Sequence, residues 1–201
     1  MVTRGFKSSG PRGDPARVPP GQYVTHDFPV LSAGPTPHTP LDAWSFAVRD
    51  VDRSVLANWS WTELLALPSS TVTADIHCVT KWSKLDTRWK GVTIDALLEA
   101  AGLDAPAPYV TAFCDGGYTT NHSSEDLVHG RGLVAYEYDG APIAPEHGGP
   151  VRLLVPHLYF WKSAKWLRGL AFMERNEPGF WETRGYHLRG DPWKEERYSG
   201  D

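Results

Sequence analysis

The sequence has little cysteine, no long hydrophobic run and no excess of positive charge. Two cysteines in 201 residues cannot build a disulfide framework, so a reducing compartment is favoured and we expect a cytoplasmic protein. The first seven residues lack the apolar core of a secretory signal, and no run reaches the length of a transmembrane helix. The net charge of −4 argues against a nucleic acid or an anionic membrane as partner.

Several motifs of known chemistry are also missing. No Cys-x-x-Cys or His-x-x-x-His spacing occurs, so a structural zinc site is not expected. No Gly-rich nucleotide fingerprint follows a strand, and the elements do not alternate as βαβ units, which argues against a Rossmann fold. The chain is instead rich in Trp, with nine, and in Pro, with 17. These tryptophans are expected to act as packing plates or pocket walls.

Composition predicts one soluble globular domain flanked by two irregular segments. Residues 1–40, rich in Pro, Gly, Ser and Thr, form an expected extended arm that packs on the body through Tyr23, Phe28, Val30 and Leu31. Residues 41–175 form the expected body, and residues 176–201 an expected tail wrapped on its surface. Strands and short helices interleave irregularly in the body, which predicts an α+β fold with several small sheets.

Hydrophobic periodicity and capping signals place the expected elements. A helix is expected to begin at Ser60, which has capping-box spacing to Glu63, and to stop before Pro68. A second is expected over 94–101 after the N-cap Thr93, and a short one over 125–128 after Ser123 or Ser124. Expected strands cover residues 44–48, 72–76, 109–114, 133–138, 141–143, 151–155 and 167–173.

Cys78 stands where an expected strand ends, followed by polar residues and Trp82. A free cysteine is often a small buried hydrophobe, and this reading stays open. As a nucleophile Cys78 would need a base, and its neighbour His77 points to the opposite face of a strand. Cys114 and His122 are too isolated in sequence to complete a metal site with it. A metal that takes one protein thiolate and its remaining ligands from a cofactor is compatible with the sequence.

A basic cluster follows near the C-terminal end of the body. Lysine, arginine, serine and backbone N–H groups together can bind a phosphate. The cluster lies in an acidic chain and is interleaved with aromatic residues, so an anion pocket and a solvated charged face both stay open. Its members are Arg152, His157, Lys162, Ser163, Lys165 and Arg168.

Together these segments resemble one known family. In order and rough spacing, the chain from about residue 29 to 193 is similar to the sulfite oxidase family of molybdopterin-dependent oxidoreductases, especially small bacterial members that consist of the molybdenum domain alone. The resemblance implies the fold of that domain, with mixed small sheets and short helices. The matching segments are 76–83 (IHCVTKWS), 89–92 (WKGV), 115–121 (DGGYTTN), 133–137 (LVAYE), 147–156 (HGGPVRLLVP) and 161–167 (WKSAKWL).

The resemblance implies a cofactor and a set of site residues. The single protein ligand to molybdenum in this family is the motif cysteine, which falls on Cys78. The other ligands are the dithiolene sulfurs of one molybdopterin and terminal oxygens. The residues expected to contact the cofactor, besides Cys78, are His26, His77, Thr80, His147, Arg152, Lys162, Ser163, Ala164 and Lys165. The residues expected near the substrate, again with Cys78, are Lys81, Arg88, Tyr118 and Asn121.

The implied reaction is oxygen-atom transfer at one molybdenum, on a small oxyanion, a sulfoxide or a similar small molecule. Electrons would pass to or from a partner of unknown identity. Animal sulfite oxidases bind sulfite with arginines, whereas the residue three positions after the cysteine is Lys81 here, so sulfite is not implied. A chain of 201 residues leaves no room for the dimerisation domain of those enzymes, and a monomer is expected. The alternative function is non-catalytic: a Trp-rich carbohydrate-binding module or a cofactor carrier.

Overall fold

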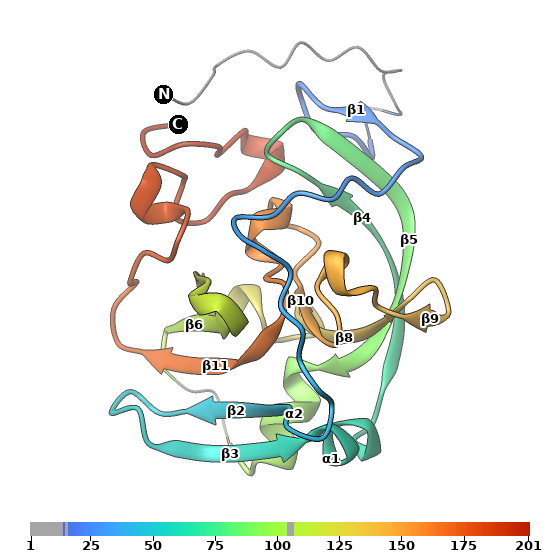
Figure 1. Ribbon diagram of the computed structural model, residues 1–201. Helices are drawn as coiled ribbons and strands as arrows, with labels where there is room; N and C mark the ends of the chain where they lie inside the picture. The colour runs from blue at the N-terminus through green and yellow to red at the C-terminus, as the bar shows by residue number, and fades with distance from the viewer. Residues whose placement is uncertain (1–13, 15, 104–106) are drawn as a thin grey trace.

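The computed structural model describes residues 14, 16–103 and 107–201. Its framework is two sheets, seen side-on in Figure 1. The six-stranded sheet has the order β1 (Tyr23–Val24), β5 (Trp82–Thr93), β8 (Leu133–Tyr138) and β10 (Arg152–Leu154), with β4 (Ser70–His77) also on β5 and β9 (Ala141–Pro142) also on β8. The five-stranded sheet has the order β3 (Val55–Ser60), β2 (Ser45–Arg49), β11 (Leu167–Met173), β6 (Tyr109–Cys114) and β7 (Thr119–Ser123).

The two α-helices are short and begin where the sequence predicts. In α1 (Trp61–Ala66) the Ser60 side chain accepts from the Glu63 N–H, and the Glu63 carboxylate accepts from the Ser60 N–H. In α2 (Ile94–Ala100) the Thr93 hydroxyl accepts from the Ala96 N–H. These contacts satisfy N–H groups that the first turn of a helix leaves free. Strands dominate the remainder, and the predicted α+β class is confirmed.

The hydrophobic residues form a large and a small cluster. The large one includes Trp44, Phe46, Leu97 and Leu153, and the small one includes Cys78, Trp82 and Trp89. Gly91 allows β5 to approach β8 closely, because a Cβ there would lie 2.2 Å from the Val134 carbonyl oxygen. The pairing register shifts at this point, between Lys90 and Gly91.

Some strands differ from the sequence prediction. β3 and β7 were not predicted, and β5 is a single strand of 12 residues where only residues 89–92 were noted. β3 lacks the alternation of apolar and polar residues because it is the edge strand of its sheet, with Val55 and Leu56 exposed. β7 reads as polar, Thr-Thr-Asn-His-Ser, yet its central residues are buried. The predicted helix over 125–128 is a 3₁₀ turn, Ser124–Asp126, capped by Ser123.

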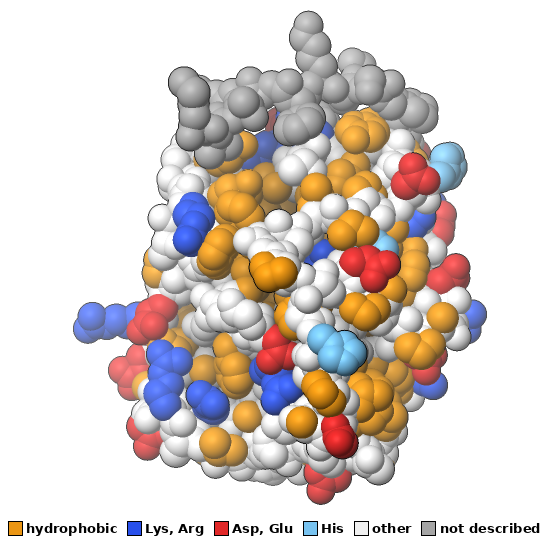
Figure 2. All heavy atoms as spheres, viewed as in Figure 1, with side chains coloured by type: hydrophobic (Ala, Val, Ile, Leu, Met, Phe, Trp, Pro, Cys, Tyr) orange, Lys and Arg blue, Asp and Glu red, His pale blue; other side chains and the backbone are white. Residues whose placement is uncertain are grey.

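The arm and the tail both pack on the body. Of the predicted arm, residues 1–13 and 15 lie outside the described residues. Beyond β1, which pairs in parallel with β5, residues 25–40 run across the front of the molecule as a strap, blue in Figure 1. Hydrophobic side chains gather on this face around the strap in Figure 2. In the tail, Glu182 and Arg197 are buried.

Candidate cofactor site

A large cavity lies behind the strap. Its volume is about 590 Å³. Strap residues 28–37 form one wall, the turn after β4 contributes Cys78 and Thr80, and the tail contributes the residues around Trp181. Arg152, the segment 163–166 and residues near Asp115 and Trp161 also line it. The cavity therefore joins parts of the chain that are more than a hundred residues apart in sequence.

Cys78 reaches the cavity from a tight turn. The Cys78 N–H donates to the Trp82 carbonyl (2.8 Å), and the Lys81 N–H donates to the Cys78 carbonyl (2.9 Å). The Thr80 hydroxyl donates to Cys78 Sγ at 3.2 Å. Burial raises the pKa of the Cys78 thiol, while hydrogen bonds from Thr80 and the charge of Arg197 oppose the rise. A bound metal cation would favour the thiolate outright.

Arg152 is a buried cation that faces the same cavity. Its Nη1 donates to the His147 carbonyl and its Nη2 to the Ser163 carbonyl, each at 2.6 Å, while its Nε has no partner among the described residues. No carboxylate of the described residues lies in ion-pair range of it. Burial lowers the pKa of Arg152 to about 9. An uncompensated buried guanidinium is costly, and an anionic ligand would relieve that cost.

Lys165 is a second cation on the cavity and ties the strap to it. Its Nζ donates to the Leu31 carbonyl at 2.8 Å and to the Glu146 carbonyl at 2.5 Å. Burial, and then the charge of Arg152, lower the pKa of Lys165 to about 8. Ser163 accepts from the Val155 N–H through its hydroxyl, and Ala164 is buried beside it. This segment can present both a cation and small side chains to a phosphate.

Two of the three histidines expected to contact the cofactor, His26 and His147, do not line the cavity. His26 is exposed, and its carbonyl accepts from Lys84 Nζ. Two residues further on, Phe28 lines the cavity and stacks on His147, with ring centroids 4.0 Å apart. His147 Nδ1 is buried without a partner among the described residues. His147 is thus placed one aromatic ring behind the cavity wall.

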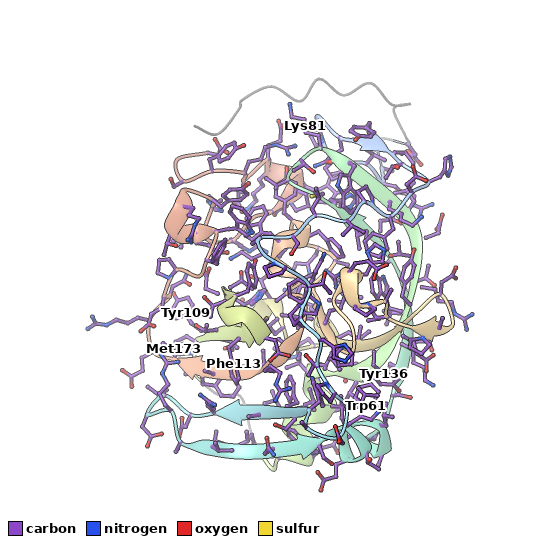
Figure 3. All side chains as sticks on the ribbon, viewed as in Figure 1. Trp61, Lys81, Tyr109, Phe113, Tyr136 and Met173 are labelled. Atoms are coloured by element: carbon purple, nitrogen blue, oxygen red, sulfur yellow. The ribbon has the colours of Figure 1, made fainter. Side chains whose placement is uncertain are left out.

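Four other predicted residues also lie off the cavity. Arg88 is exposed on β5, opposite Thr73. Lys81 sits at the tip of the cysteine turn with a φ of 79°, at the end of the molecule next to β1 in Figure 3. His77 is buried, its Nδ1 lies 2.9 Å from Ser83 Oγ, and burial lowers its pKa to about 4. Asn121 is buried on β7.

Lys162 belongs to an internal ion pair and not to the cavity lining. Its Nζ lies 2.6 Å from Glu182 Oε1 and donates to Asn121 Oδ1 at 2.9 Å. Burial lowers the pKa of Lys162, and Glu182 opposes this. The sequence could not show this, because the partner carboxylate is twenty residues further along the chain. Neither side chain lines the cavity. Asn121 is therefore not placed to contact a substrate there, and Lys162 is not placed to contact a phosphate.

The structure brings together seven of the predicted site residues and adds several that the sequence reasoning missed. The predicted residues on the cavity are Cys78, Thr80, Tyr118, Arg152, Ser163, Ala164 and Lys165. The Tyr118 hydroxyl donates to the Trp161 carbonyl at 2.8 Å. The missed lining residues include Phe28, Trp161, Phe180, Trp181 and Tyr186. Phe28 was predicted only as an anchor of the arm and Trp161 only as part of a matching segment, while Phe180, Trp181 and Tyr186 lie in a tail without periodicity.

These residues fit a metal that is held mainly by a cofactor. Within the described residues, no group of three or more His, Cys, Asp and Glu side chains could hold a metal ion. Cys78 offers one soft thiolate, and Arg152 and Lys165 offer positive charge on the same cavity. A molybdopterin would bring the missing metal ligands and an anionic phosphate. The donor set therefore fits the group that the resemblance implies.

Comparisons with known proteins agree with this fit. The model of the oxidoreductase molybdopterin binding domain matches residues 33–181. The chain is 46% identical over 187 residues to "Uncharacterized oxidoreductase YuiH" of Bacillus subtilis strain 168, covering 92% of this chain and 93% of that protein. It is 29% identical to "Putative protein-methionine-sulfoxide reductase subunit YedZ1" of Azospira oryzae, covering 87% and 67%.

More distant similarities extend the comparison. The chain is 27% identical to the sulfite oxidase of Gallus gallus, over 49% of this chain and 24% of that protein. Among solved structures, the sulfane dehydrogenase SoxCD of Paracoccus pantotrophus superposes with a TM-score of 0.61 at 18% identity, over 70% of this chain and 40% of that one. At this identity the superposition shows a shared fold.

The chain belongs to the oxidoreductase molybdopterin-binding domain family, of the sulfite oxidase type, and is an oxidoreductase of that class. The family prediction made from the sequence motifs is confirmed. Among the described residues, no helix has both the length and the apolar character needed to traverse a bilayer.

Proposed function

We propose that this chain catalyses oxygen-atom transfer to or from a small substrate, using one molybdenum held by Cys78 and one molybdopterin. The observation that carries the proposal is the meeting of a lone thiol and an uncompensated buried guanidinium, Arg152, on one cavity. Lys165 adds a second cation on the same lining. A cofactor that carries both a metal and a phosphate would provide a partner for the thiol and for the guanidinium, whereas a simple metal ion would leave Arg152 uncompensated.

The bound cofactor would supply two-electron exchange of an oxygen atom. In one direction a sulfite-like substrate gains an oxygen from water, and two protons and two electrons leave. In the other direction a sulfoxide or N-oxide takes up two electrons and two protons, and its oxygen leaves as water. The names of YedZ1 and of the Gallus gallus protein support sulfoxide reduction and sulfite oxidation as candidates for this chain.

The protein's own residues would hold and orient the reactants. Thr80 fixes Cys78 Sγ through its hydroxyl, and Arg152, Ser163, Ala164 and Lys165 would hold the anionic end of the pterin. Tyr118 would orient the substrate from the opposite wall. Strap residues 28–37 exclude bulk water from one side of the cavity.

The proposal extends to location and partners. We place the protein in the cytoplasm, because Cys78 and Cys114 are both free thiols. We expect a monomer that exchanges electrons with a separate carrier. Neither a nucleic acid nor a membrane is expected as partner, since the net charge is −4.

The alternative, a Trp-rich carbohydrate-binding module, has less support. Such a module needs exposed tryptophans, and among the large hydrophobic side chains exposed in the described residues Trp193 is the one tryptophan, at 45% exposure. Trp44, Trp59, Trp82 and Trp89 are buried. A cofactor carrier would use the same cavity as the proposed enzyme and would differ from it only in having no catalytic activity.

Metal analysis tests the proposal directly. Protein produced in a host that makes molybdopterin should contain one molybdenum per chain and show thiolate-to-metal absorption, and Cys78→Ser should lose both. Cys114→Ser is the matched control, because Cys114 is also buried but does not line the cavity. Stoichiometric zinc, or retention of molybdenum by Cys78→Ser, would contradict the proposal. Sulfite, sulfoxides and N-oxides should then be screened with artificial electron carriers, and a loaded protein inactive on all of them would support a carrier.

A further inference from the structure

A buried ion pair lies directly behind one wall of the cavity. The side chains of Lys162 and Glu182 are both fully inaccessible, with Nζ and Oε1 2.6 Å apart. Lys162 also donates to the Asn121 side chain and to the Leu188 carbonyl, so its three N–H bonds are used internally. Buried pairs of this kind are retained in some proteins because they fix one arrangement of the chain.

Glu182 links this pair to the cavity wall. Its Oε1 accepts from Trp161 Nε1 and from the Thr120 hydroxyl, each at 2.9 Å. Trp161 itself lines the cavity. The same carboxylate therefore holds a wall residue from η4 (Phe160–Lys162), a residue of β7 and the turn η5 (Glu182–Arg184) that carries Glu182.

The chain just before Glu182 is also held closely against β7. The Phe180 N–H donates to the Thr119 carbonyl at 2.8 Å. Gly179 permits this approach, because a Cβ there would lie 2.5 Å from the Thr119 oxygen. The turn is thus docked on β7 by its backbone and anchored by one carboxylate.

The docked turn presents aromatic rings to the cavity. Phe180, Trp181 and Tyr186, together with Trp161, form what we call the aromatic wall. Its ring centroids lie 5.1 Å apart in the pairs Phe180–Trp181, Trp181–Tyr186 and Trp161–Tyr186. The rings of the turn are half-buried, so they keep contact area for a ligand.

The positive charge of the cavity lies elsewhere. The cations on its lining are Arg152 and Lys165, and both lie on the side of the strap. The Lys165 amino group donates to the Leu31 carbonyl, and Arg152 Cζ lies 4.1 Å from the ring centroid of Phe160. Phe160 in turn packs against the strap residue Phe28. Glu182 neutralises Lys162, and the residues of the aromatic wall add no charged side chain to the cavity lining. Arg184, whose Cζ lies 3.7 Å from the ring centroid of Phe180, is exposed and does not line the cavity.

We propose that Glu182, through its pair with Lys162, is a positioning residue that fixes the aromatic wall, and that this wall makes the site select substrates with an uncharged apolar substituent. The inference rests on the proposed function for the reaction and adds the determinant of specificity. An aryl group can stack on such rings and gains free energy on leaving water, whereas an inorganic dianion meets no cation on this part of the cavity lining.

Equilibrium binding tests this without relying on turnover. Isothermal titration of the molybdenum-loaded protein with methyl p-tolyl sulfoxide and with dimethyl sulfoxide gives the ratio of the two dissociation constants. The wild type should bind the aryl compound more tightly by about tenfold or more. Glu182→Gln and Trp181→Ala should bring this ratio close to one. Glu177→Gln is the matched control, since Glu177 lies on the same tail in an exposed pair with Arg53 and should keep the ratio.

The outcomes separate positioning from general structural support. A purely structural role of Glu182 would lower thermal stability and the binding of both sulfoxides together, leaving their ratio unchanged, and that result would overturn the proposal. Equal binding of both compounds by the wild type would also overturn it. If Glu182→Gln fails to fold, Phe180→Ala and Trp181→Ala still decide whether the wall sets the ratio. A protein that keeps the ratio but transfers no oxygen would contradict the proposed function alone.

Discussion

The guanidinium of Arg152 lies over the ring of Phe160, 4.1 Å from its centroid, and donates to the carbonyls of His147 and Ser163. Stacking and carbonyl acceptors orient this cation without neutralising it. The protein therefore holds a buried positive charge on the cavity, and a bound anionic group would balance it.

Arg152→Ala should reduce pterin retention about tenfold or more, because a charge-assisted hydrogen bond contributes roughly 1.5–3 kcal/mol. Cofactor content after gel filtration, relative to protein, measures this. The fold should survive, since a buried unpaired charge is removed. Arg53→Ala, in an exposed surface pair, is the control and should retain full cofactor. Unchanged content in Arg152→Ala would move the phosphate site elsewhere.

Lys165→Met should loosen the strap as well as the cofactor. It removes the hydrogen bonds to the Leu31 and Glu146 carbonyls, each worth about 0.5–1.5 kcal/mol. We expect faster limited proteolysis within residues 28–37 and a lower pterin content. Lys90→Met, whose amino group pairs with Glu137 on the surface, should leave both unchanged. A protease-resistant strap in Lys165→Met would show that its anchor lies in other contacts.

Asp126 should make stability fall in acid. Burial alone would raise its pKa, but hydrogen bonds from His157, Arg189 and Ser123 outweigh burial and hold the pKa of Asp126 well below its usual range. A carboxyl with a lowered folded-state pKa stabilises the fold above its unfolded pKa of about 3.9, and this contribution is lost as the pH falls below that value.

Urea unfolding at pH 7 and at pH 3 measures that loss. The drop in the free energy of unfolding between these pH values should be smaller in Asp126→Asn than in the wild type. Asp191→Asn is a useful comparison, because Asp191 also pairs with Arg189 but leaves the contacts of Asp126 with His157 and Ser123 intact. An equal drop in wild type and Asp126→Asn would assign the acid sensitivity to other carboxyls.

Gly179→Ala should detach the aromatic turn from β7. The new Cβ would lie 2.5 Å from the Thr119 oxygen and 2.6 Å from the Thr120 Cα, both backbone atoms that cannot yield cheaply. Overpacking of this kind costs about 1–3 kcal/mol. Amide exchange should accelerate in residues 180–186. Gly34→Ala, where nothing lies within 4 Å of the added carbon, should leave stability unchanged. Unaltered exchange in Gly179→Ala would mean that the backbone can shift at little cost.

Local signals in the sequence predicted local structure well. Ser60 and Thr93 cap helices where capping residues were noted, and β6, β8 and β11 match apolar runs at 109–114, 133–138 and 167–173. β7 was missed because its side chains are polar, although the tail buries them: Thr120 donates to Glu182, and Asn121 donates to Asn176 and to the Leu188 carbonyl. Burial by a distant segment leaves no periodic trace in the strand itself.

Motif spacing identified the family and the thiol of Cys78, together with the cations Arg152 and Lys165, which share a cavity. Motif spacing alone could not separate Lys162 from Lys165. These lysines stand three residues apart in one basic cluster, yet one faces the cavity and the other is locked to Glu182 in the interior. The direction of each side chain depends on the turn between them, which only the packed chain fixes.

The sequence by itself determined the class of the protein, because the order of a few motifs carries the chemistry of a thiolate ligand and an anion pocket. Tertiary structure alone decided which residues surround the reaction space. The strap and the aromatic wall meet there from opposite ends of the chain. Such long-range contacts follow from the packing of whole surfaces, which no local pattern of residues encodes.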